Sequence, residues 1–136
     1  MSWTHSLIRI STYEVETLQK RLSEIVARRV AFEMRLASLD AEEESERLHA
    51  MENAEANIYL AGFREGVRIR REGLHAELAL VTAEEEGARD ALSEAFEAQK
   101  KFERVAENAR VAAELESARR ETAALDELGL MRRKAS

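Results

Sequence analysis

The chain contains no cysteine and no proline among its 136 residues, and it has only 5 glycines and 5% aromatic residues. Without cysteine there is neither a disulfide framework nor a thiolate zinc site. Without proline, and with so little glycine, the sequence lacks the turns that punctuate a β-sandwich or barrel. Apolar strand runs followed by glycine-rich loops, as in an α/β enzyme, are also missing. The expected fold class is therefore all-α.

Long apolar runs are missing as well. No stretch approaches the roughly 18 apolar residues of a membrane-spanning helix, so we expect no direct membrane insertion. The formal net charge is −6, from 21 basic and 27 acidic side chains, which argues against a nucleic-acid-binding surface. A chain of this length is expected to form a single domain over residues 1–136.

Two heptad repeats dominate what is present. Ala, Glu, Leu, Arg and Lys make up 83 of the 136 residues, a composition typical of coiled coils. Apolar positions at alternating spacings of three and four predict two coiled-coil seams. The first seam consists of Ile8, Ser11, Val15, Leu18, Leu22, Ile25, Arg29, Phe32, Leu36 and Leu39. The second consists of Leu74, Leu78, Val81, Glu85, Ala88, Leu92, Ala95, Gln99, Phe102, Ala106, Ala109 and Ala113.

The two seams fit each other as an antiparallel hairpin. When facing residue numbers add to 113 or 114, Leu39 meets Leu74 and Ile25 meets Ala88. The charged seam residue of each helix, Arg29 and Glu85, then falls opposite the other, with opposite sign. Such a polar pair within an apolar seam can fix the register, at some cost in stability. We therefore predict a long two-helix antiparallel coiled-coil hairpin with Arg29 and Glu85 as its register-setting pair.

The same register predicts the boundaries. Helix one is expected over about 6–52, the turn over about 53–57 and helix two over about 58–128, with an unpaired helical overhang over about 113–136. Asn53 and Asn57 tolerate left-handed backbone best in the turn, and Gly129 is a candidate helix stop. The acidic segment 40–46 should lie opposite an arginine cluster. That cluster consists of Arg64, Arg68, Arg70 and Arg71.

Two exposed surfaces are candidate binding sites. A cluster just after the turn holds more apolar surface than a two-helix tip can bury, which favours partner contact over self-packing. It comprises Ile58, Tyr59, Leu60, Phe63, Val67 and Ile69. The overhang is either a partner-binding helix or a frayed tail.

No catalytic constellation is present, so we expect no enzyme activity and no cofactor, and we expect no metal either. Two Glu-x-x-His motifs, ending at His49 and His75, invite a di-metal reading. The antiparallel register separates the two histidines along the hairpin by about 16 Å at the rise of an α-helix. They are therefore expected to be solvated.

Several segments resemble the flagellar FliJ family, over nearly the whole chain. These are Ser6-Leu7-Ile8-Arg9-Ile10 with Tyr13-Glu14-Val15, Ile58-Tyr59-Leu60 with Phe63, Ala91-Leu92 with Ala95-Phe96, and Leu125-Asp126-Glu127-Leu128-Gly129-Leu130-Met131-Arg132-Arg133. The closest similarity is to the alphaproteobacterial form. FliJ proteins are small coiled-coil proteins of the bacterial flagellar type III export apparatus. They resemble the stalk formed by the gamma subunit of rotary ATP synthases.

The resemblance implies a function. A FliJ-like protein inserts in the hexameric flagellar export ATPase and promotes its assembly and hydrolysis. It also contacts the export gate protein FlhA and binds export chaperones, at the cytoplasmic face of the inner membrane. The isolated chain is expected to be a monomer.

The resemblance also assigns two sets of contact residues by position. The export-gate contact falls on Phe63, Val67, Arg70 and Leu74, where Arg70 departs from the apolar or neutral residues that the family favours. The ATPase-ring contact falls on the overhang. Its residues are Arg119, Arg120, Leu125, Asp126, Glu127, Arg132 and Arg133.

Three alternatives remain open from the sequence. The first is the equivalent stalk of a virulence type III secretion system. The second is an export chaperone or scaffold that wraps partner helices. The third is a parallel coiled-coil dimer, which a contact between positions 29 and 85 within one monomer would exclude.

Overall fold

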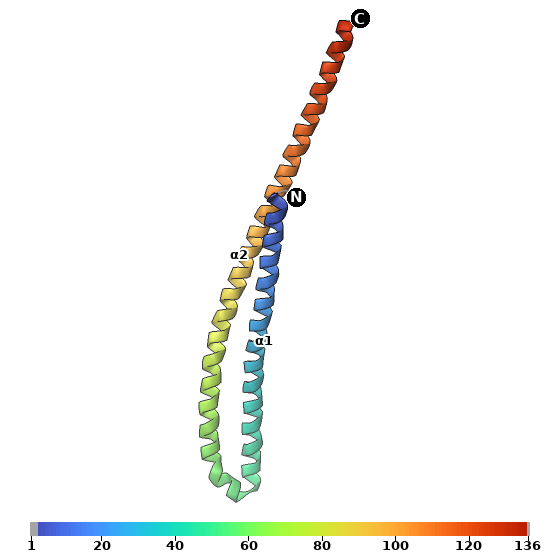
Figure 1. Ribbon diagram of the computed structural model, residues 1–136. Coiled ribbons are helices and arrows are strands. Elements are labelled where there is room, and N and C mark those ends of the chain that lie inside the picture. The colour runs from blue at the N-terminus through green and yellow to red at the C-terminus, as the bar shows by residue number, and fades with distance from the viewer. Residues whose placement is uncertain (1–2, 136) are drawn as a thin grey trace. The chain divides into compact units, whose positions relative to one another are not determined.

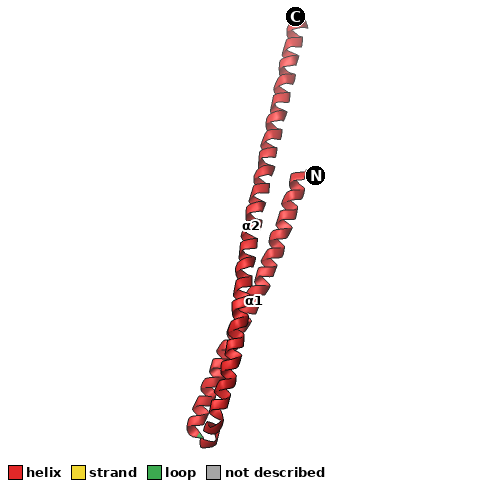
Figure 2. Cartoon of the chain, turned by 90° about the vertical axis from the view of Figure 1, so that its left-hand side faces the viewer, coloured by secondary structure: helices red, strands yellow, loops and turns green. Residues whose placement is uncertain are grey.

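The computed structural model describes residues 3–135, all of which except Asn53 lie in helices. Helix α1 spans Trp3–Glu52 with 50 residues, and helix α2 spans Ala54–Ala135 with 82 residues. Figure 1 shows the segments of the two helices next to the turn lying side by side with opposite chain directions, and Figure 2 shows no strand in this described range. The predicted all-α antiparallel hairpin is confirmed.

The chain divides into two compact units. The first, called here the tip unit, is Glu16–Ser93 and contains the turn with the flanking parts of both helices. The second, called the end unit, combines the start of α1 up to Val15 with α2 from Glu94 onward.

The core of the tip unit follows the predicted register. Ile25, Val81 and Ala88 are buried in one cluster, and the partly buried Leu22 and Phe32 pack against it. This cluster agrees with the predicted register, in which Ile25 faces Ala88 and Phe32 faces Val81. Because each helix supplies only one buried stripe, this narrow seam carries most of the hydrophobic stabilisation of the unit.

The seam of the end unit is more polar. Its buried residues include Thr4 and Ser11 of α1 beside Val15. The Ser11 hydroxyl donates to the Ile8 carbonyl at 2.9 Å, and the Gln99 amide donates to the Thr12 hydroxyl at 3.1 Å. These bonds satisfy polar groups that would otherwise be costly to bury.

The overhang is helical to its described end. Every residue over 107–135 is exposed, yet α2 continues to Ala135. The prediction that Gly129 ends the helix is wrong. An interior glycine costs a helix only about 1 kcal/mol relative to alanine, and strong helix formers lie on both sides of Gly129. The basic side chains of the last turn also complement the negative end of the helix dipole.

The turn is shorter than expected. Only Asn53 interrupts the helices, and its side-chain oxygen accepts a hydrogen bond from the Glu55 amide at 2.9 Å. Asn53 therefore caps the N-terminus of α2. No residue in the described range has a positive φ, so the turn does not use the left-handed backbone that asparagine tolerates. Asparagine serves here through its side-chain acceptor instead.

The buried seam predicts the effect of a truncation in the tip unit. Ile25 is 2% exposed, so Ile25→Ala should lower the free energy of unfolding by about 2–4 kcal/mol, measured by urea unfolding. The control is Ile69→Ala, because Ile69 is 57% exposed and its truncation should change stability by less than about 0.5 kcal/mol. Equal losses in the two variants would contradict the observed packing.

Candidate interaction surfaces

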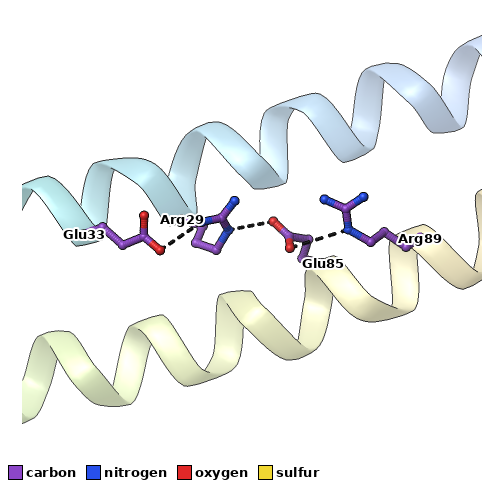
Figure 3. Close-up of polar contacts among 4 residues, drawn as sticks. All are labelled: Arg29, Glu33, Glu85 and Arg89. Atoms are coloured by element: carbon purple, nitrogen blue, oxygen red, sulfur yellow. Dashed lines mark hydrogen bonds and ion pairs between the residues drawn. The ribbon is translucent and has the colours of Figure 1, made fainter.

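A polar network crosses the seam of the tip unit at the predicted position. Arg29 Nε donates to Glu85 Oε1 at 2.8 Å, which confirms the predicted contact between these residues within one monomer. Figure 3 shows how Glu33 and Arg89 extend the network. Glu33 accepts a second bond from Arg29 at 2.8 Å, and Arg89 approaches Glu85 at 3.6 Å. The contact between Arg29 and Glu85 excludes the alternative of a purely structural, parallel coiled-coil dimer.

The network biases the ionisation of its members. The hydrogen bond from Arg29 is the main reason that the pKa of Glu85 lies below its usual value, and partial burial opposes the shift. The side chain of Glu85 is only 13% exposed and that of Arg29 is 27% exposed. Since a slip of register would leave both groups half-buried without a partner, this pair favours one alignment of the two helices.

The acidic segment over 40–46 meets α2 chiefly through one arginine. Arg71 bridges Asp40 at 2.7 Å and Glu43 at 2.6 Å, and the hydrogen bond that it donates to Glu43 is the main cause that raises the pKa of Arg71. The prediction is wrong for Arg68, which pairs with Glu65 and Glu72 on its own helix. Side chains three and four residues apart are neighbours on a helix surface, which favours these local pairs.

The predicted export-gate residues do not form one accessible face. Val67 is fully buried, and Phe63 and Leu74 are partly buried. Arg70 is exposed and lines a groove of the tip unit together with Leu74 and Leu39. The role of these residues in gate contact stays a prediction. Among the four, a partner could reach only Arg70 and the exposed edges of Phe63 and Leu74.

The apolar cluster after the turn also divides. Ile58 and Tyr59 are 76% and 75% exposed, whereas Leu60 and Phe63 are partly buried. Met51 of α1 adds a third strongly exposed apolar side chain near the turn. Packing within the tip unit therefore buries part of this cluster, while the side chains of Ile58 and Tyr59 remain exposed to solvent.

The predicted ring-contact residues all lie on the exposed overhang. Leu125 is 68% exposed, and Leu128 and Met131 extend the same apolar stripe. Arg120 approaches Glu116 at 3.4 Å, which is an ordinary pair along one helix. The stripe is thus flanked by charge, and no described residue of the end unit covers it.

A further exposed surface lies at the start of α1 and was not predicted from the sequence. Trp3, Ile10 and Tyr13 of α1 are between 63% and 71% exposed. Their spacing could have revealed them, but the stronger seam on the other side of the same helix dominated the pattern.

Neither a membrane-spanning helix nor a metal-binding cluster is found in the part of the chain that the structure describes. No helix there has a stretch apolar enough to cross a bilayer. No group of three or more potential ligands gathers there for a metal ion, and His49 and His75 lie outside any such group.

Comparison with known proteins gives two close relatives. The chain is 51% identical over 130 residues to the protein called flagellar FliJ protein in each of two strains of Caulobacter vibrioides. The match covers 96% of this chain and 94% of each relative. No family model and no solved structure matches the chain.

The depressed pKa of Glu85 predicts a pH-dependent effect of removing its charge. Its contribution to stability is complete above the ordinary glutamate pKa and is lost as the pH falls through the lower pKa of the folded protein. Glu85→Gln should therefore melt below the wild type at pH 7, and the gap should narrow as the pH falls below about 4. Thermal unfolding followed by circular dichroism measures the gap at each pH.

The matched control is Glu86→Gln, because the neighbouring Glu86 is exposed and makes no ion pair with any described residue. It should melt like the wild type at pH 7. A pH-independent gap for Glu85→Gln would show that its ionisation does not stabilise the seam.

Proposed function

Because the chain belongs to the flagellar FliJ family, we propose that it is a non-catalytic component of the bacterial flagellar type III protein export apparatus. It acts as the stalk that inserts in the hexameric export ATPase and promotes ring assembly and ATP hydrolysis. The observation that carries this proposal is the overhang of the end unit. It is a helix that continues past the seam with an exposed apolar stripe and flanking charges.

The overhang has the features of a binding element. A single helix cannot bury Leu125, Leu128 and Met131 by itself, and exposed apolar stripes of this kind mark protein contacts. The flanking charges supply orientation, since charged rims steer partners and fix register. We assign ring contact to these residues. They are Arg119, Arg120, Leu125, Asp126, Glu127, Arg132 and Arg133.

The tip unit carries the proposed coupling to the export gate protein FlhA. Arg70 and Leu74 line a groove there, and the partly buried Phe63 lies on the same helix. Val67 supports this face from beneath, as a buried residue that holds α2 against α1. We also propose that the protein binds export chaperones and acts at the cytoplasmic face of the inner membrane.

The flagellar system is favoured over a virulence secretion system because both relatives are flagellar proteins. The alternative of an export chaperone or scaffold is distinguished by stoichiometry. A stalk binds one copy per ATPase hexamer, whereas a chaperone binds its cargo one to one.

The stalk proposal predicts stimulation of ATP hydrolysis by the matching flagellar ATPase. Titration with the full chain should saturate near one copy per six subunits, and truncation after residue 112 should abolish the effect. In the full chain, Leu125→Glu should raise the half-saturating concentration by at least about tenfold, because it places a charge in the apolar stripe.

Leu80→Glu is the matched control, since Leu80 is an exposed leucine of α2 in the tip unit and should leave stimulation unchanged. Absence of stimulation by the folded full chain would overturn the stalk proposal. Equal losses in the two leucine variants would move ring contact away from the overhang.

A further inference from the structure

Helix α1 carries a second heptad stripe within the end unit, on the side away from α2. Its members, called here the outer seam, are Trp3, Ser6, Ile10 and Tyr13, at spacings of three, four and three. All four are exposed, with Trp3 and Ile10 at 63% and Tyr13 at 71%. At about 100° per residue, the outer seam lies roughly 150° around α1 from the buried seam. A helix packed there meets no part of α2 in this unit.

The outer seam has the composition of a helix-packing surface. It includes one β-branched and two aromatic side chains and no charge, in a chain in which 35% of the residues are charged. Aromatic residues are enriched at protein interfaces. With Trp3 and Ile10 at position a, Ser6 and Tyr13 fall at position d of a heptad.

Charged residues flank the outer seam at the positions that select partners in coiled coils. Arg9 occupies position g, and Glu14 occupies the following position e. Neither forms an ion pair with another described residue. Their spacing of five residues is unsuited to pairing along one helix, where partners lie three or four apart. The sequence places a second pair of this kind, Glu16 and Arg21, one heptad later.

We propose that the outer seam binds a second copy of this chain, with the two α1 helices parallel. In that arrangement Trp3, Ser6, Ile10 and Tyr13 each meet their own counterparts across a two-fold axis. Arg9 of each copy meets Glu14 of the other copy, so both flanking charges gain an opposite partner.

The charges select the parallel orientation. The antiparallel alignment that keeps all four outer-seam residues in contact pairs Trp3 with Tyr13 and Ser6 with Ile10. It also places Arg9 directly against Arg9 of the other copy, and like charges at this position disfavour the pairing. The parallel alignment has no such conflict.

The interface is short, so its dissociation constant is on the order of micromolar or weaker. Dilute protein remains monomeric, in agreement with the expectation for the isolated chain. Pairing then depends on local concentration. It involves a different helix and a different face from the proposed ring contact, and it does not rest on the proposed function.

Cysteine crosslinking tests the orientation, because the natural chain has no cysteine that could interfere. Ser6→Cys places thiols opposite each other in the parallel pair, so oxidation by copper phenanthroline should yield a covalent dimer on a non-reducing gel. Ser45→Cys is the matched control, because Ser45 is an exposed serine of α1 outside the outer seam. Crosslinking of Ser6→Cys no faster than that of Ser45→Cys would overturn the proposal.

Charge reversal tests the flanking pairs by sedimentation equilibrium of the full chain. Arg9→Glu and Glu14→Arg should each weaken dimerisation at least about fivefold, because each sets like charges against each other. The double variant should recover the wild-type dissociation constant, since it restores opposite charges in the parallel alignment alone. A wild type that stays monomeric at several hundred micromolar, or single variants that dimerise like it, would refute the proposal.

Discussion

An ion pair between Arg29 and Glu85 crosses the seam of the tip unit, and we propose that it sets which residues of α1 and α2 face each other there. Alanine and leucine recur along both seams, so a slip by one heptad would still place apolar residues opposite apolar residues. A slip would, however, leave a half-buried guanidinium and a half-buried carboxylate without partners, which is costly. The register in turn brings Arg71 to Asp40 and Glu43. Because α2 has 82 residues and α1 only 50, antiparallel pairing leaves the end of α2 unpaired.

The two units differ in how much of their apolar surface is buried within the hairpin. In the tip unit the hairpin buries the apolar seam, including Val67, while Ile58 and Tyr59 stay exposed near the turn. In the end unit the buried seam is partly polar, while apolar side chains lie outside it on the overhang and on the outer seam of α1. Apolar surface that a chain leaves exposed on rigid helices is available to partners at little cost in ordering. The end unit is therefore where protein contacts are concentrated in our proposals.

Periodicity predicted the fold because heptad spacing and opposite charges, both readable from the sequence, limit how two distant helices can pair. The pairing of Arg29 with Glu85 followed from that alignment alone. Predictions based on local rules were less successful. Arg68 found nearer partners on its own helix, Asn53 capped α2 through its side chain, and Gly129 was carried through by its helical neighbours. The burial of Val67 and the exposure of Arg70 depend on side-chain packing in this part of α2, where Arg71 rather than Arg70 forms the ion pairs with α1. A repeat pattern does not resolve that choice.

The most direct test of the register is a charge-reversal cycle at the seam. Arg29→Glu, Glu85→Arg and the double variant should be compared with the wild type by thermal unfolding at neutral pH. Each single variant places like charges in a half-buried contact and should melt well below the wild type. The double variant restores opposite charges at the same place and should melt above both single variants. Additive losses in the double variant would contradict the claim that this pair sets the alignment of the two helices.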